Sequence, residues 1–264
     1  MMSAAIKDKR AIVTGGANGL GFIYVRHMLL KGAKAVAILD VDVATGTSAV
    51  EKLHVEFGQN RAVFFSTDVS KADQLKASFN KAVEHLGGLD IMINNAGILD
   101  DSKWSLMIDI NIKALIQGTW MAIETMGKHK GGKGGTIINV GSIAAFLMTK
   151  YIPVYCATKS AVVSFTRSVS RNFDHTGVNI KAICPGPTDT FLMTSGAHRF
   201  PEYVNQEDGV KFMHTWPLQK PEIMAKEVMR LIEEGPNGAI WVNTVDSPTV
   251  SLNIPEYTAW GTPV

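Results

Sequence analysis

The sequence predicts an α/β protein of one domain, residues 1–264, with a parallel sheet of about seven strands and helices on both faces. Short apolar runs alternate with longer segments of helical periodicity along the whole chain, and no Pro- or Ser-rich linker or internal repeat interrupts them. A glycine-rich turn follows the first apolar run. With 264 residues, 46% of them hydrophobic, the chain can bury one large core. These features are typical of a doubly wound Rossmann fold.

Charge and cysteine content narrow the classes of function. The 26 basic and 24 acidic residues give a net charge of +2, so no overall field favours nucleic acid or an anionic membrane. No apolar run approaches the roughly 18 residues of a membrane span, and the first eight residues lack the apolar core of a signal peptide. Cys156 and Cys184 form no CxxC pair, and the histidines form no HExxH motif. We expect a cytoplasmic protein without a metal site that acts on small molecules.

The first predicted strand, residues 11–13, leads into the turn TGGANGLG and a helix that extends to Leu30. Glycines let such a turn bend sharply and approach a pyrophosphate, whose charge the N–H groups at the helix start would stabilise. The turn supplies the candidate cofactor-binding residues Gly15, Asn18, Gly19, Leu20 and Gly21. Its GxxxGxG spacing differs from the generic GxGxxG fingerprint, so a purely structural turn explains it equally well when it is considered alone.

The second predicted strand, residues 35–39, ends at Asp40. A carboxylate at this position can accept hydrogen bonds from both hydroxyls of an adenosine ribose. The same carboxylate repels a 2′-phosphate, and Val41 and Asp42 offer no compensating cation. NAD is therefore favoured over NADP, with a turn or cap role for Asp40 as the alternative.

The alternation continues with strands at 62–66, 89–93 and 136–140 and helices at 71–86 and 102–126. Asp68 and Val69 follow the third strand, where they are placed to meet an adenine, although Asp68 would serve nearly as well as a helix cap. The motif NNAG closes the fourth strand, and its small residues suit close approach of a cofactor. It contributes the candidates Asn95, Ala96 and Gly97.

Four polar residues farther along the chain are candidates for the chemistry. Asn111 lies in an otherwise apolar helical turn, and its amide needs partners, which a structural or a catalytic role would supply. Tyr155 and Lys159, four residues apart, share one face of a helix. A base that acts at neutral pH needs the pKa of tyrosine, about 10, lowered by about 2 to 3 units. Lys159 in a partly dry cleft is expected to supply that lowering, the more so if a cationic cofactor ring lies beside it, and Ser142 is placed to hold the substrate oxygen.

The last third of the chain adds a strand at 178–184, a helix at 221–234 and a strand at 239–242. The turn after the first of these strands brings Pro185, Gly186, Thr188 and Thr190 to the sheet edge where ligands of open α/β sheets bind. The segment 191–217 is irregular and rich in large apolar residues, which predicts a lid at about 188–220 over a hydrophobic substrate; ordinary loop packing is the alternative. The tail at about 243–264, with Tyr257 and Trp260, is expected to cover a neighbouring subunit.

Together these motifs resemble the short-chain dehydrogenase/reductase family over essentially the whole chain. The likeness rests on TGGANGLG, Asp40, NNAG, Asn111, Ser142, the Tyr155-x-x-x-Lys159 pair and the Pro185-Gly186 turn, in this order and spacing. The segments PVYCATK and AICPGP resemble the 15-hydroxyprostaglandin dehydrogenase-like and insect alcohol-dehydrogenase-like members. One departure is Ile152, because the prostaglandin enzyme has at this position a glutamine that helps to hold its substrate. Prostaglandin is therefore not the expected substrate.

The resemblance implies roles for single residues. Tyr155 would be the general acid/base, and Lys159 would lower its pKa while holding the nicotinamide ribose. Ser142 would orient the substrate oxygen, and Asn111 would support a water that relays the proton. Thr188 and Thr190 would bracket the nicotinamide carboxamide.

The implied reaction is NAD-dependent oxidation of an apolar secondary alcohol, such as a terpenoid, retinoid, steroid or lipid, by a homodimer or homotetramer. One alternative is an NADPH-type carbonyl reductase, and Asp40 argues against it. The other is a nucleotide-bound sensor without turnover, which the intact set of Ser142, Tyr155 and Lys159 makes the weaker hypothesis.

Overall fold

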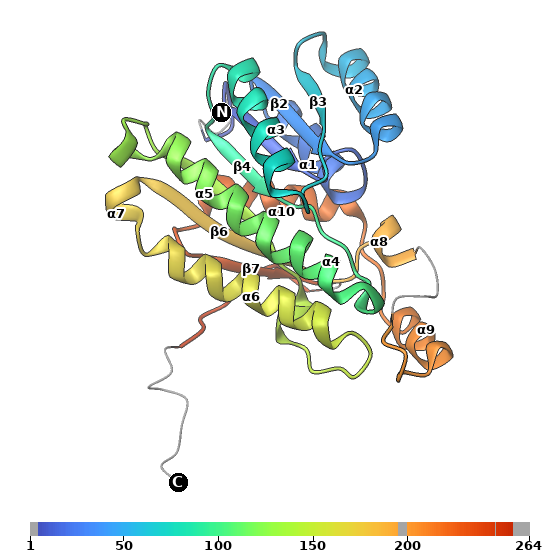
Figure 1. Ribbon diagram of the computed structural model, residues 1–264. Coiled ribbons are helices and arrows are strands. Elements are labelled where there is room, and N and C mark those ends of the chain that lie inside the picture. The colour runs from blue at the N-terminus through green and yellow to red at the C-terminus, as the bar shows by residue number, and fades with distance from the viewer. Residues whose placement is uncertain (1–4, 195–199, 246, 256–264) are drawn as a thin grey trace.

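The computed structural model describes residues 5–194, 200–245 and 247–255, and in them an eight-stranded sheet lies between two layers of helices (Figure 1). The strand order is β3-β2-β1-β4-β5-β6-β7-β8, with β1 to β7 parallel and β8 antiparallel to β7. The strands are β1 (Arg10–Thr14), β2 (Ala35–Asp40), β3 (Ala62–Ser66), β4 (Ile91–Asn94), β5 (Gly135–Val140), β6 (Val178–Pro185), β7 (Ile240–Asn243) and β8 (Val250–Ser251). The order reverses between β1 and β4, which places a ligand crevice at the carboxyl ends of these strands. The predicted doubly wound fold is confirmed.

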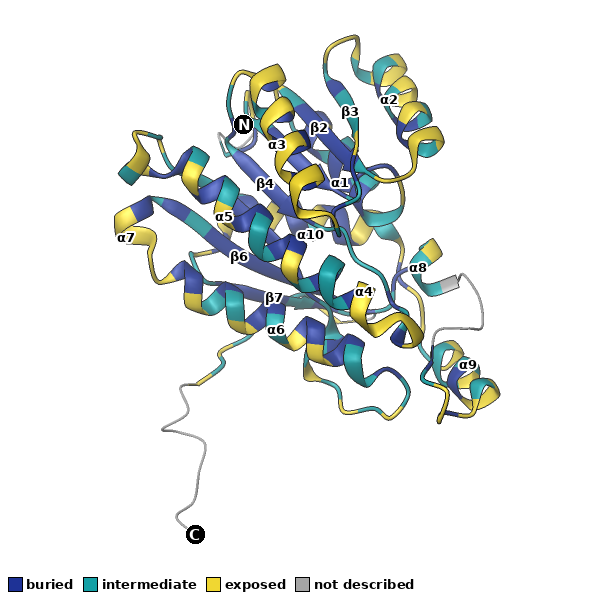
Figure 2. Ribbon diagram, in the orientation of Figure 1, coloured by how far each residue is buried: buried dark blue, intermediate teal, exposed yellow. Residues whose placement is uncertain are grey.

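The two helical layers bury the sheet on both faces, as Figure 2 shows by the buried strands and the exposed outer sides of the helices. The α-helices are α1 (Gly19–Leu30), α2 (Val43–Phe57), α3 (Ala72–Leu86), α4 (Trp104–Ile108), α5 (Leu115–Met126), α6 (Pro153–Ser170), α7 (Phe173–Thr176), α8 (Phe191–Thr194), α9 (Gln206–His214) and α10 (Pro221–Glu234). One core cluster joins α1, α2 and α10 to the sheet, and a second joins α3, α5 and α6 to it. Because the strands are buried on both faces, they read as continuous apolar runs.

The predicted helix at 102–126 is divided into several parts. It begins as a 3₁₀ turn, Asp101–Lys103, continues as α4, passes through a π-helical segment, Asp109–Ala114, and ends as α5. A π-segment inserts an extra residue into a helical turn and often occurs at functional sites. The helical pattern along 102–126 does not predict this division.

The structure adds two details to the prediction of about seven strands and a lid segment. The sheet has eight strands, because Val250 and Val242 pair antiparallel at its edge, so the start of the predicted tail belongs to the fold. Leu252 and Ile254 pack on the adjacent apolar cluster, whereas Tyr257 and Trp260 lie outside the described residues. The segment 191–217, predicted to be irregular, contains α8 and α9.

Within the described residues, no helix combines the length and the apolar character that crossing a membrane requires.

Candidate active site

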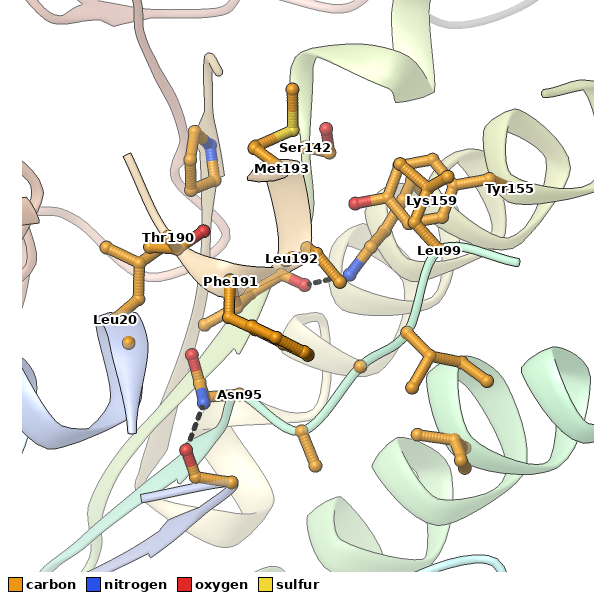
Figure 3. A pocket seen from close by; sticks show the side chains of 18 of the residues that line it. Leu20, Asn95, Leu99, Ser142, Tyr155, Lys159, Thr190, Phe191, Leu192 and Met193 are labelled. Atoms are coloured by element: carbon orange, nitrogen blue, oxygen red, sulfur yellow. Dashed lines mark hydrogen bonds between the residues drawn. The ribbon is translucent and has the colours of Figure 1, made fainter. Parts of the chain in front are cut away.

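A cavity of about 610 Å³ lies at the carboxyl ends of the parallel strands, and residues of α8 and α9 contribute to its lining. Figure 3 shows part of this lining. The cavity has a nucleotide end, lined by residues that follow β1 to β4, and a substrate end, lined by large apolar side chains. The predicted residues that line it are Gly15, Asn18, Gly19, Leu20, Gly21, Asp40, Asp68, Val69, Asn95, Ala96, Gly97, Ser142, Tyr155, Lys159, Pro185, Gly186, Thr188 and Thr190. Asn111 is the exception and lies behind the wall.

The glycine turn at the nucleotide end is held in a shape that side chains would prevent. Gly15 and Gly19 have φ of +63° and +52°, a region that residues other than glycine rarely adopt. A Cβ on Gly21 would lie 2.0 Å from the carbonyl oxygen of Gly15. Asn95 Nδ2 donates to the carbonyls of Thr14 (2.9 Å) and Gly15 (3.0 Å), which fixes the turn to the end of β4. The start of α1 therefore faces the cavity with N–H groups suited to a pyrophosphate.

Asp40 lies at the end of β2 with its carboxylate oriented by two main-chain groups. Its Oδ2 accepts from the N–H of Ala17 at 3.0 Å, and its Oδ1 accepts from that of Asp42 at 3.2 Å. The cap of α2 is Asp42 rather than Asp40, since Asp42 Oδ1 accepts from the N–H of Thr45. Among the described residues that line this end, none is a lysine or an arginine. The site thus suits a ribose with free hydroxyls better than one carrying a phosphate.

Asp68 and the threonines after β6 make local hydrogen bonds beside the cavity. Asp68 Oδ1 accepts from the N–H (3.0 Å) and the hydroxyl (2.6 Å) of Ser70, and the N-cap position of α3 belongs to Lys71. Thr188 donates its hydroxyl to the carbonyl of Gly186 at 2.9 Å, and Thr190 donates to that of Thr188 at 3.2 Å. These bonds hold the turn at the sheet edge where the sequence places it.

Ser142, Tyr155 and Lys159 meet where the two ends of the cavity join. Tyr155 and Lys159 are 6% and 5% exposed, and the Lys159 Nζ lies 5.6 Å from the centre of the phenol ring. This Nζ donates to the carbonyl of Val140 at 3.0 Å. Ser142 Oγ accepts from the N–H of Ala144 at 3.1 Å, and the Ser142 hydroxyl is near enough to Tyr155 to act on the pKa of its phenol. In Figure 3 the Phe191 ring points into the cavity between Asn95 and this group.

Burial dominates the proton affinities of this group. It raises the pKa of Tyr155 to about 12, an effect that Ser142 only partly opposes. It also lowers the pKa of Lys159 to about 8. The expected lowering of the Tyr155 pKa by Lys159 is absent from the protein by itself, because the loss of water around the phenolate raises the pKa and the opposing contribution comes from Ser142 rather than from the amine.

Asn111 is buried in the π-helical segment and tied to neighbouring residues. Its Oδ1 accepts from the N–H of Ile98 at 2.9 Å, and its Nδ2 donates to the Ile98 carbonyl at 2.9 Å and to the Thr158 hydroxyl at 3.2 Å. A Cβ on Gly97 would lie 3.3 Å from Asn111 Oδ1 and 3.6 Å from Lys159 Nζ, so the amide lies directly behind Gly97. The structural alternative considered for Asn111 is supported, while its role in holding a water stays a prediction.

The substrate end is a hydrophobic chamber. Its apolar lining consists of Ile98, Leu99, Leu106, Ile110, Leu147, Ile152, Phe191, Leu192, Met193, Phe212, Met213 and Trp216. At its rim Lys103 Nζ lies 3.7 Å from Asp100 Oδ2. Sequence reasoning identified the contribution of the segment after β6 but missed Ile98 to Ile110 and Leu147, because nothing in an apolar run tells a cavity wall from ordinary core.

Comparison with known proteins identifies the family. The model of the short chain dehydrogenase family matches residues 9–199. The chain belongs to this family. Human 15-hydroxyprostaglandin dehydrogenase (NAD(+)) is 36% identical over 241 residues, which cover 89% of this chain and 90% of that protein. Alcohol dehydrogenase 1 of Ceratitis capitata is 31% identical over 242 residues, covering 90% and 93%.

The family fold is also found among solved structures. The crystal structure of levodione reductase superposes with a TM-score of 0.78 and covers 90% of this chain and 96% of that one, at 22% identity. At that identity the likeness concerns the fold alone. The predicted resemblance to the short-chain dehydrogenases is confirmed by the family match and by both relatives.

Proposed function

We propose that this protein oxidises an apolar secondary alcohol to the ketone, with NAD as hydride acceptor and Tyr155 as general base. The observation that carries the proposal is the single cavity in which a glycine turn and Asp40 lie at one end, a hydrophobic chamber lies at the other, and Ser142, Tyr155 and Lys159 lie between them. A nucleotide and an apolar alcohol can thus meet at the phenol.

The residues of the nucleotide end fit NAD. The Gly15 to Gly21 turn leaves main-chain N–H groups for the pyrophosphate, and each Asp40 oxygen has accepted one N–H bond and retains capacity for a ribose hydroxyl. When bound, the oxidised nicotinamide would supply a hydride acceptor and a positive charge. Thr188 and Thr190 line the cavity on the side of β6, where they are proposed to hold the carboxamide.

The chain's own groups would handle the proton. Ser142 Oγ receives one hydrogen bond from the N–H of Ala144, so its own hydrogen is available to the substrate oxygen or the phenol. Once its own phenol is ionised, Tyr155 would accept the proton of the alcohol. One N–H group of Lys159 donates to the carbonyl of Val140. We propose that its other N–H groups bind the nicotinamide ribose and favour the phenolate.

The chamber supports an apolar substrate, and a named relative narrows its class. Human 15-hydroxyprostaglandin dehydrogenase, 36% identical, acts by its name on a hydroxylated lipid, and a hydroxylated terpenoid, retinoid, steroid or lipid would fit walls of Leu, Ile, Met and aromatic side chains. Ile152 adds one more apolar surface near Tyr155. We therefore propose substrates that carry little polarity next to the reacting carbinol.

The decisive experiment follows NADH formation by its absorbance with a panel of apolar secondary alcohols, supplying NAD and NADP in parallel. Turnover that favours NAD by at least tenfold is the expected result. A preference for NADPH with ketones would establish the reductase alternative instead, which Asp40 argues against. Nucleotide binding without turnover of any alcohol would favour the sensor alternative.

Tyr155→Phe tests the assigned base. The variant keeps the ring that packs in the core and loses the hydroxyl, so kcat should fall by about 10³-fold or more while the Kd for NAD stays within about twofold. Ser164→Ala, an exposed position on the same helix, is the matched control. A Tyr155→Phe enzyme with more than a tenth of the normal kcat would refute the assignment.

We also propose that the enzyme works in the cytoplasm as a homodimer or homotetramer. Trp120 on α5 is 47% exposed and packs edge-on against Phe165 of α6, which leaves an aromatic surface on the two long helices. Light scattering that gives only a monomer mass would refute the oligomer, and cell fractionation would test the location.

A further inference from the structure

The helix that carries Tyr155 and Lys159 has its N-terminus capped by a distant residue. Its own N-cap position, Ile152, makes no side-chain hydrogen bond, and Pro153 has no N–H group. The next two N–H groups bind one carboxylate: Asp101 Oδ2 accepts from Val154 at 2.7 Å, and Asp101 Oδ1 accepts from Tyr155 at 3.1 Å. Both donors of this turn are thereby satisfied.

Asp101 is a costly residue to place here. It is 3% exposed, and burying an ionised carboxylate is unfavourable unless charge-assisted hydrogen bonds compensate for the lost water. Burial raises its pKa, whereas the two bonds from Val154 and Tyr155 oppose that rise. The positive end of the α6 dipole adds a further favourable interaction with the anion.

The other main-chain group of Tyr155 is held by the same part of the chain. Its carbonyl accepts from the Thr158 hydroxyl at 2.8 Å, and Asn111 Nδ2 donates to that hydroxyl at 3.2 Å. Asn111 in turn binds both main-chain groups of Ile98. The segment 98–111 therefore reaches the N–H of Tyr155 through Asp101 and its carbonyl through Asn111 and Thr158.

This segment is also a wall of the cavity. Ile98, Leu99 and Ile110 line the substrate end, and Asp100 and Lys103, on either side of Asp101 in the sequence, line its rim. The wall that contacts the substrate and the tyrosine that would take its proton are thus fastened to each other. Because a misplacement of about 1 Å can cost about 10²-fold in rate, such a fastening bears on catalysis.

We propose that Asp101 is the positioning residue for Tyr155, which it holds in register with the substrate-side wall through its bonds to the N-terminus of α6. The inference rests on the proposed role of Tyr155 as base. Asp101 touches neither substrate nor cofactor in this role, and it acts by fixing where the phenol oxygen lies.

The test compares Asp101→Asn, Asp101→Ala and Asp101→Glu in the full-length enzyme, with the alcohol that gives the fastest turnover. Asn keeps the size but turns an N–H₂ toward one of the two donors, and Ala removes both acceptors. We expect kcat to fall about tenfold for Asn and about tenfold to a hundredfold for Ala, with the Kd for NAD within twofold. Glu retains the carboxylate and should recover more of kcat than Asn.

Two readouts separate positioning from mere support of the fold. The deuterium isotope effect on kcat with carbinol-deuterated substrate should increase in Asp101→Asn, because hydride transfer becomes the slow step. Asp174→Asn, which alters an exposed carboxylate in the first turn of α7, is the matched control and should leave kcat and the isotope effect unchanged. The proposal is wrong if Asp101→Asn lowers the melting temperature but leaves kcat, measured below that temperature, within twofold of the normal value.

The outcome can be told apart from a failure of the proposed function. Residual activity of Tyr155→Phe would overturn the assigned base, whereas loss of activity there with unaltered kcat in Asp101→Asn would overturn only this inference. If the Asp101 variants do not fold, Thr158→Val cuts the connection to the Tyr155 carbonyl. A kcat within twofold of normal for folded Thr158→Val would then reject the proposal.

Discussion

The two ends of the cavity differ in which parts of the chain form their walls. The nucleotide end consists mainly of main chain held in fixed shapes, with Gly15 at positive φ and Asn95 bonded to the carbonyls of the turn. The substrate end consists of side chains on short helices and loops, and Phe191 there is 72% exposed although it lines the cavity. The shape of the nucleotide end thus depends on backbone conformation, whereas that of the substrate end depends on which apolar side chains line it.

This difference predicts how each end responds to change. A main-chain cradle does not tolerate an added atom that points at its own backbone, because the neighbouring backbone cannot rotate out of the way. An apolar chamber with flexible methionines can adjust to a changed side chain or a new substrate. Substitutions at the first should therefore destroy cofactor binding, and those at the second should redirect substrate preference.

The largest effect is expected from Gly21→Ala. Its Cβ would lie 2.0 Å from the Gly15 carbonyl, so the turn must open, the Kd for NAD should rise about a hundredfold, and stability should fall by about 1 to 3 kcal/mol. Gly19→Ala is the matched control, because the nearest atoms to its Cβ belong to Thr190 at 3.7 Å and only the positive φ is strained. Equal Kd values for the two variants in calorimetry would contradict a shape-defined nucleotide end.

Asp40→Ala should have a smaller effect on the same end. The loss of a charged acceptor for the ribose hydroxyls should raise the Kd for NAD by about tenfold, consistent with about 1.5 kcal/mol for a hydrogen bond to a charged group. Removing the repulsion should also bring NADP within about tenfold of NAD. Steady-state kinetics with both cofactors measures this, and an unchanged preference would exclude Asp40 as the discriminating group.

Trp216→Ala should leave the nucleotide end intact. The indole lines the substrate end and packs edge-on against Phe212, so its removal should raise the KM for bulky apolar alcohols about three- to tenfold by lost burial. The Kd for NAD should not change. A comparable loss of NAD affinity would mean that the two ends do not behave as separate parts.

The smallest expected effect is the pH dependence of stability that arises from buried lysines, one of which lies at the junction between the two ends of the cavity. Burial lowers the pKa of Lys159 and of the distant Lys181 to about 8 from 10.5, so the unfolded chain holds more protons between pH 8 and 10. The two lysines therefore make the free energy of unfolding rise with pH in that window, each by at most about 1.4 kcal/mol per unit. Above about pH 9 the buried thiol of Cys184, whose pKa burial raises to about 12, contributes the opposite slope, because unfolding then releases its proton. The raised pKa of Tyr155 adds to this opposite slope above pH 10.

Urea unfolding at pH 7.5, 8.5 and 9.5 measures this slope. Lys159→Met and Lys181→Met should each flatten it, because each removes one buried amine. Equal slopes in the wild type and both variants would show that neither amine loses its proton in the folded state.

The sequence by itself determined much of the nucleotide end. Strand periodicity located every parallel strand, and the Gly15 to Gly21 turn, Asp40 and the Tyr155–Lys159 pair fell in one cavity as expected. These features can be predicted from the sequence because each depends on a local requirement, such as a positive φ, a four-residue helical spacing or the end of a buried apolar run.

Only the tertiary structure decided the rest. The caps that Asp101 gives to α6, the π-helical turn around Asn111 and the pairing of β8 depend on contacts between segments far apart in the chain. The direction of the Tyr155 pKa shift was likewise set by how much water the fold removes from the phenol, and not by its spacing from Lys159. Desolvation and long-range hydrogen bonds are properties of the packed molecule, so no pattern along the sequence encodes them locally.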